Sequence, residues 1–240
     1  MTRITIEPTR SRNFALHSAV PARSRRHAVA WWVVFALAWL VVAYGAVYLI
    51  LRDRVFPPDL AASFKARPWG IYPHVVVGML SIGIGPLQFH PRIQANTALH
   101  RTLGTIYVGT AMLIGIVGVY MAVYSFGGMI THAGFGLLGA GATITTAIAY
   151  RKVLVRKYAE HREWMIRSYA LIFGAATLRL WLPVLITGYR GEFLPAYLWV
   201  SWVSWVPNLI LAEWYIRHSR KRPLRFAGER LDRSREPIPA

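Results

Sequence analysis

Four histidines are the residues of this sequence best suited to hold a metal, because each lies near one end of a long apolar segment. They are His74, His100, His132 and His161. Neutral imidazole is a good axial ligand for haem iron, and a haem between two helices takes one imidazole from each side. Histidines that meet at equal depth in two membrane helices would therefore bind a haem b.

An arginine lies deep in the segment that begins at His161. Eighteen residues, or five helical turns, separate His161 from Arg179, so both are expected to point the same way about 27 Å apart. A charge at that depth in hydrocarbon usually faces a polar partner inside the bundle. We expect Arg179 to bind the propionate groups of a haem.

The composition indicates a membrane protein. Of 240 residues, 55% are hydrophobic and 16% are charged, and the mean hydropathy is +0.36. The absence of cysteine excludes disulfides, thiolate metal sites and cysteine nucleophiles. The formal net charge of +18 comes from residues that flank apolar segments rather than from a basic recognition element, so nucleic acid is not an expected partner.

Six apolar segments predict an all-α, polytopic membrane bundle of six transmembrane helices. They are residues 31–51, 71–89, 103–124, 130–150, 164–187 and 193–216. The second to fifth are expected to form a four-helix core that carries all four histidines. The domain organisation is then a disordered basic tail (1–30), a transmembrane domain (31–216) and a second basic tail (217–240), which we expect to be unstructured.

Lysine and arginine predict the orientation of these spans. Of the 28 such residues, 22 lie in segments on the side of both termini and five on the other, while Arg179 lies between. By the positive-inside rule both termini are cytoplasmic. The basic excess then needs only anionic lipid headgroups as its partner.

This topology sorts the histidines into two layers. His74 and His132 begin spans that run inward, so they lie near the outer face, and His100 and His161 precede spans that run outward, so they lie near the inner face. Two haem b groups, each held by one pair, would carry electrons between the two faces. His90 also lies on the inner side and is an alternative to His100.

Small residues follow three of the histidines along one helix face, which begins at Gly78, Gly104 and Gly136. Such faces let something bulky approach the backbone. We expect these glycines to contact a haem, and the alternative is that they pack against a neighbouring helix.

Parts of the sequence resemble known families. The strings HVVVGMLSIGIGPLQF, ALHRTLGTIYVG and EHREWMIRSYALIFGAATLRLWLPVL are similar to the bacterial multi-pass membrane family labelled domain of unknown function 2306. That resemblance implies a location in the bacterial cytoplasmic membrane and little chemistry. The histidine layout resembles the ascorbate-reducible di-haem transmembrane cytochrome b family, in which four consecutive helices each supply one ligand. It implies His74 with His132 at an outer haem and His100 with His161 at an inner one; no ascorbate-binding signature is present, so the electron donor is not implied.

The sequence therefore predicts a di-haem b-type electron carrier or quinol-linked oxidoreductase, with a quinone or redox partner. An alternative is a small-molecule or proton-coupled transporter in which Arg179 binds an anion and the histidines relay protons. A further alternative is a non-catalytic assembly protein. Asn208 and Glu213 are expected to form hydrogen bonds within the bundle or to bind a quinone head.

Overall fold

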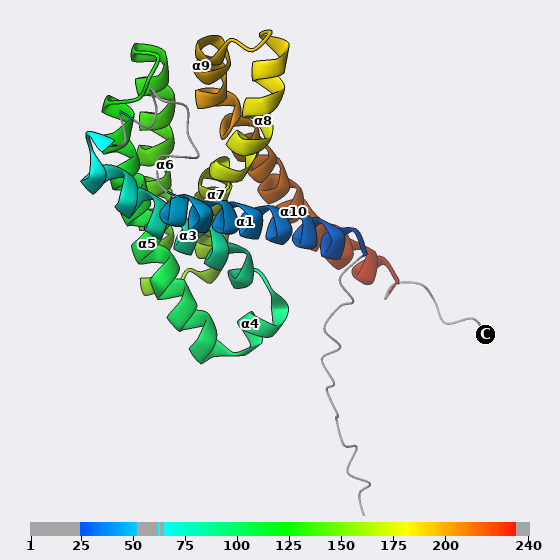
Figure 1. Cartoon of the computed structure of the whole chain (residues 1–240). Coiled ribbons are helices and arrows are strands. Elements are labelled where there is room, and N and C mark those ends of the chain that lie inside the picture. Colours follow the sequence, from blue (N-terminus) through cyan, green and yellow to red (C-terminus); the bar gives the residue numbers. More distant parts are fainter. Residues whose placement is uncertain (1–24, 52–61, 63–64, 234–240) are drawn as a thin grey trace, which may run out of the picture.

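The computed structural model describes residues 25–51, 62 and 65–233, and within these ranges its regular structure is entirely helical. Figure 1 shows the arrangement of the helices. Their bounds are α1 (Arg25–Leu51), α3 (Pro68–Gln88), α4 (Pro91–Ala95), α5 (Thr97–Val123), α6 (Met129–Leu154), α7 (Tyr158–Ile172), α8 (Gly174–Gly188), α9 (Phe193–Val203) and α10 (Val206–Arg233).

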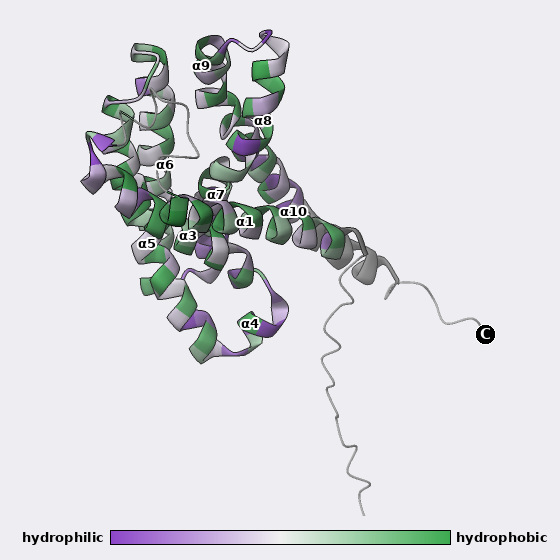
Figure 2. Cartoon of the chain, in the orientation of Figure 1, coloured by the Kyte–Doolittle hydropathy of each residue, from purple (hydrophilic) through white to green (hydrophobic). Residues whose placement is uncertain are grey.

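Six helical stretches are long and apolar enough to cross a membrane, which confirms the predicted six-helix transmembrane bundle. They are His27–Leu51, Pro68–Gln88, Thr97–Val123, Met129–Leu154, Tyr158–Gly188 and Phe193–Arg220. The fifth combines α7 with α8, and the sixth combines α9 with the first half of α10. Figure 2 shows apolar residues over the sides of the helices and hydrophilic residues gathered at α4 and at the turn between α8 and α9.

Four of these helices form a closed ring. Helix α5 packs against both α3 and α6, and α7 packs against the same two helices. Helices α3 and α6 therefore face each other diagonally across the ring, as do α5 and α7. Helix α1 crosses the outer face of α3, and α9 and α10 pack on α6 and α7 (Figure 1).

The closest approach in the ring is between α5 and α6. A Cβ atom added at Gly115 would lie 2.7 Å from the carbonyl oxygen of Gly139 and would overlap the hydroxyl of Thr143. An added Cβ at Gly139 would lie 2.7 Å from the Gly115 carbonyl. Two glycines thus let the backbones touch, as small residues do in membrane helix pairs.

Two helix interruptions lie side by side. Helix α7 gives way to α8 at Phe173, and α9 gives way to α10 at Ser204, where Pro207 supplies no N–H to the carbonyl four residues earlier. The Asn208 amide donates to the carbonyl oxygens of Ser204 (3.0 Å) and Ala170 (3.3 Å), and the Thr177 hydroxyl donates to that of Ser204. Asn208 therefore serves the bundle, which is the first of the two roles expected for it.

Three expectations about helix bounds need correction. The interruption at Phe173 means that His161 and Arg179 do not lie on one uninterrupted helix. Helix α1 begins at Arg25, so residues 25–30 are helical rather than part of a disordered tail. Helix α10 continues to Arg233, so most of the segment expected to be unstructured after residue 216 is helical. Residues 1–24 and 234–240 lie outside the described part of the chain.

We expect Gly115→Ala to lower the free energy of unfolding by about 1–3 kcal/mol, because the added methyl group forces α5 and α6 apart. Gly109→Ala is the matched control, since its added Cβ meets no atom of the described residues within 4 Å. Thermal unfolding of both purified variants in detergent measures the difference. Equal melting temperatures for the two variants would contradict the role given to the Gly115–Gly139 contact.

Candidate functional site

The four-helix ring has two ends, each with two of the four histidines. One end carries His100 and His161 and is called the His161 end. Helices α5 and α7 begin there, and helices α3 and α6 end there. Helices α3 and α6 begin at the opposite, His132 end, which carries His74 and His132. Each histidine lies inside its helix: His74 is the seventh residue of α3, and the other three are the fourth residues of theirs.

His100 and His161 lie at equal depth on α5 and α7. Tyr107 of α5 and Ser168 of α7 share a hydrogen bond of 2.9 Å between their hydroxyl groups, and each lies seven residues after the histidine of its helix. Seven residues make almost two full turns, so each histidine leaves its helix in nearly the same direction as the hydroxyl residue above it. The two imidazoles are also close enough to interact electrostatically.

The backbone of α6 fixes the orientation of the His161 ring. Its Nδ1 atom lies 2.8 Å from the carbonyl oxygen of Ala149. A carbonyl accepts, so the proton is on Nδ1 and the lone pair is on Nε2. Metal-binding histidines are commonly held in this way, with one ring nitrogen on a backbone carbonyl and the other available as ligand.

Two buried polar atoms at the same end lack a hydrogen-bond partner among the described residues, namely His100 Nδ1 and Gln88 Nε2. The Gln88 side chain is 4% exposed, and its Oε1 atom lies 3.3 Å from the position that a Cβ of Gly104 would take. Gly104 is one turn beyond His100, so the free glutamine and histidine atoms belong to one small region. Buried polar groups without partners are uncommon in folded proteins and here indicate a place for a ligand or water.

A buried hydroxyl layer lies directly beyond this region. The Ser168 hydroxyl bonds to Tyr107 and, at 2.6 Å, to Thr146 of α6, and these three side chains are fully buried. The residue next to Ser168, Tyr169, donates from its hydroxyl to the Ile82 carbonyl of α3 (3.2 Å). All four helices of the ring therefore meet in one polar layer near its middle.

The Tyr169 hydrogen bond compensates for a proline. Pro86 has no N–H to give to the Ile82 carbonyl four residues earlier in α3, and the tyrosine hydroxyl donates to it instead. An added Cβ at Gly85 would overlap the Tyr169 ring, so a glycine is needed at this position.

The structure does not bring His74 and His132 to one level. An added Cβ at Gly78 would contact Ile114, so His74, one turn earlier on the antiparallel α3, lies near the level of residue 118 of α5. The Nε2 atom of His132 lies 3.0 Å from the carbonyl oxygen of Ser125, after the end of α5. Seven residues along a helix axis correspond to about 10 Å. The outer pair predicted from the sequence is therefore staggered by about two turns.

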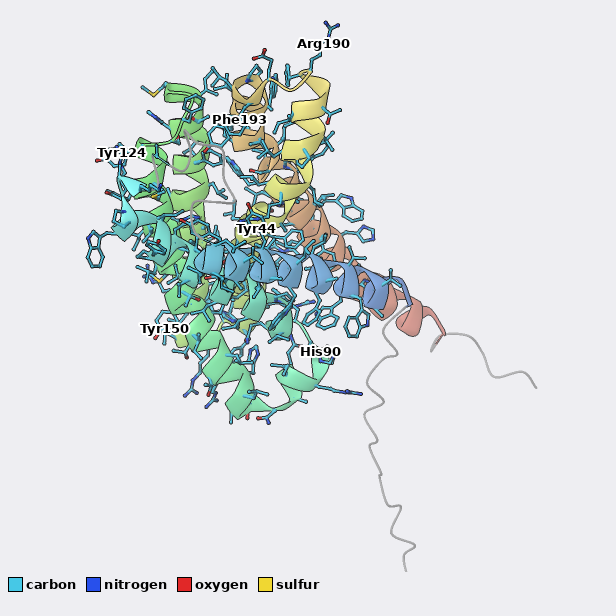
Figure 3. All side chains as sticks on the ribbon, in the orientation of Figure 1. Tyr44, His90, Tyr124, Tyr150, Arg190 and Phe193 are labelled. Carbon is cyan, nitrogen blue, oxygen red and sulfur yellow. The ribbon has the colours of Figure 1, made fainter. Side chains whose placement is uncertain are left out.

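His74 instead lies near Arg179. The two are close enough to interact electrostatically, and His74 Nδ1 is buried without a hydrogen-bond partner in the described part of the chain. The Arg179 guanidinium lies over the Tyr44 ring, 4.9 Å from its centroid, and donates from Nη1 to the Ala175 carbonyl (2.7 Å). Figure 3 labels Tyr44 on α1, where that helix passes α8.

Other residues singled out in the sequence have local roles. His90 caps α4 by accepting from the Arg92 N–H (3.3 Å), and its ring packs on Trp31, so its side chain is engaged away from His161; Figure 3 shows it beside α4. Glu213 forms an ion pair with Arg167, which is the bundle role rather than the quinone role.

The three glycines expected to contact haem lie against neighbouring side chains. Gly78 faces Ile114, Gly104 faces Gln88, and an added Cβ at Gly136 would lie 3.9 Å from that of Ala122. These contacts are the helix packing that was the alternative for the glycine faces.

The sequence also contains signals that reasoning from histidines alone does not use. Tyr107 and Ser168 share a seven-residue spacing from His100 and His161, which places each hydroxyl on the face of its histidine. Gln88 and Tyr169 carry no such spacing, and their roles follow from contacts between helices. No three histidine, aspartate or glutamate side chains converge as a metal-ion site within the described ranges.

Comparison with known proteins gives one match. A family model described as "Predicted membrane protein (DUF2306)" matches residues 71–216, from α3 to the middle of α10. No curated protein and no solved structure matches the chain.

We expect Tyr169→Phe to lower the free energy of unfolding by about 1–3 kcal/mol, because the Ile82 carbonyl loses its donor in a buried site. Adding Pro86→Ala should recover part of that loss, since residue 86 then has an N–H for the same carbonyl. Thermal unfolding of the single and double variants measures both effects, with the exposed Tyr150→Phe as control. A double variant no more stable than Tyr169→Phe would contradict this account of Pro86.

Proposed function

This chain belongs to the DUF2306 family of predicted membrane proteins, and we propose that it is a membrane electron-transfer protein that holds one haem b between His100 and His161. The observation that carries the proposal is that these two histidines lie at equal depth on diagonal, parallel helices, on the helix faces that the Tyr107–Ser168 hydrogen bond joins. The stagger of His74 and His132 is the reason for proposing one haem rather than the two expected from the sequence.

The residues at the His161 end suit such a group. The Nε2 atom of His161 carries a lone pair because Nδ1 is held by the Ala149 carbonyl, and His100 presents a buried nitrogen without a partner in the described ranges. On the face of α5 that carries His100, Gly104 is the first residue after the histidine, and it has no side chain. The Gln88 side chain lies over this glycine. The Gln88 side chain would therefore have to move for a haem to lie between α5 and α7.

A haem with two imidazole ligands supplies reversible one-electron chemistry and leaves no open position for oxygen. The chain's own residues set the conditions for it. The Ala149 carbonyl fixes the ring of His161, and the buried layer of Tyr107, Ser168 and Thr146 closes the site toward the middle of the bundle. The site thus has a dry side toward the bundle centre and an open side toward the helix ends.

The position of the site defines where a redox partner approaches. His100 and His161 are each the fourth residue of a helix, so the site lies within about 6 Å of the helix ends along the axis. By the positive-inside count this end faces the cytoplasm of a bacterial cell, and a quinone or a protein at that face is the proposed partner.

We expect the protein purified from haem-supplemented cells to show b-type bands in its reduced-minus-oxidised spectrum and about one haem per chain. His100→Ala and His161→Ala should each abolish the bands, because either change removes an axial ligand. His132→Ala and His90→Ala are matched controls that should retain them. Gel filtration confirms that each variant is folded.

Two results would refute the proposal. One is wild-type protein without b-type bands from cells that load other haem proteins. The other is a spectrum that survives in folded His100→Ala and His161→Ala protein.

A further inference from the structure

Arg179 differs from two other arginines that the structure describes in detail. Arg167 holds Glu213, and Arg220 holds Glu163, each through the edge of the guanidinium formed by Nε and Nη2. Arg179 has no carboxylate within ion-pair distance among the described residues. Its Nη1 atom is engaged by the Ala175 carbonyl, which leaves the Nε–Nη2 edge available. This edge matches two oxygens of one phosphate or carboxylate group.

The surroundings of Arg179 complete a small site. His74 supplies the buried Nδ1 atom that has no partner in the described part of the chain. Its neighbour Val75 packs on α1 beside Tyr44, since an added Cβ at Gly45 would lie 3.6 Å from the Val75 side chain. The Tyr44 ring supports the guanidinium from the side of α1. Tyr44 is 39% exposed and Arg179 is also exposed, so a group that arrives between α1 and α8 can reach the arginine.

The depth of the site makes a bound anion favourable. Arg179 lies nine residues before the end of α8, which corresponds to about 13 Å along the helix axis. An arginine at such depth without a countercharge is unfavourable. An oxyanion on the free edge of the guanidinium offsets that cost.

We propose that Arg179 and His74, with Tyr44 behind the guanidinium, form a binding site for a single oxyanion, a phosphate or carboxylate group, within the membrane. Arg179 would hold two oxygens through Nε and Nη2, and His74 would donate to the anion from Nδ1. The group can be carried by a lipid headgroup or by a small free anion, since the contacts to both are the same. The site is separate from that of His100 and His161 and does not depend on haem.

Two measurements on the full-length protein distinguish these sources. For free anions, inorganic phosphate and succinate are titrated by calorimetry into protein in phosphatidylcholine nanodiscs at constant ionic strength. For lipids, native mass spectrometry counts the phosphatidylglycerol molecules retained after mild detergent extraction. Arg179→Gln removes the charge and the paired N–H donors of the guanidinium, and Arg179→Lys keeps the charge without the paired donors. Arg190→Gln, in the exposed turn between α8 and α9, is the matched control.

We expect Arg179→Gln to abolish one binding event, in either the calorimetric or the mass-spectrometric measurement, and Arg179→Lys to weaken it at least tenfold. Arg190→Gln should leave it unchanged. Without ligand, the melting temperature of Arg179→Gln should be no lower than that of the wild type, because the variant removes an unpaired charge. A loss of binding in this variant is then not caused by a loss of folding. Binding in both measurements that is equal in wild type and folded Arg179→Gln, or absent from the wild type, overturns the proposal.

Discussion

The hydrogen bonds of Ser168 to Tyr107 and Thr146 fix the depth of three helices relative to one another. Dispersion and close glycine contacts hold apolar helices together, but they permit sliding, because an apolar face looks much the same one turn away. A hydrogen bond between buried hydroxyls has a defined length and direction, and losing it in an apolar interior is unfavourable. This contact therefore aligns α5, α6 and α7, and it makes His100 and His161 level two turns below.

The membrane also explains why side chains serve backbone carbonyls in two places. A carbonyl that loses its helical donor to proline finds no water in hydrocarbon, so the protein must supply a replacement. Tyr169 supplies it to Ile82, whose carbonyl Pro86 leaves without a donor, and Asn208 donates to the carbonyls of Ser204 and Ala170 where α9 gives way to α10. In each case the hydrogen bond joins two helices, α7 to α3 through Tyr169 and α10 to α7 through Asn208. At both helix irregularities, the side chain that serves the backbone carbonyl also forms a contact between two helices.

Hydropathy was sufficient to predict the six spans and the four-helix core, because length and apolarity are properties of each segment alone. The equal depth of His100 and His161 was also predictable, since both lie at the start of parallel helices. The stagger of His74 and His132 was not, because the level of α3 against α5 depends on which side chains Gly78 and its neighbours meet. The interruption of the helix at Phe173 was not predicted, for a related reason. Gly174 alone is a weak signal in the sequence, and the interruption that lies beside it in space, near Pro207, is about thirty residues further along the chain. Whether the glycine faces contact a cofactor or a neighbouring helix could be decided only from the contacts between helices.

The interruption at Phe173 divides the fifth span into two parts that have different neighbours. His161 belongs to α7, which is held inside the ring by Ser168 and Tyr169, whereas Arg179 belongs to α8, which packs on α9 and α1. The chemistry of the two ends also differs: one has two histidines at the same depth, and the other holds the Arg179 guanidinium without a carboxylate at ion-pair distance among the described residues. Asn208 donates to Ala170 of α7 and to Thr177 of α8, so both parts of the span are held to α10 at the interruption, while the level of the histidines and the position of Arg179 are set by different contacts.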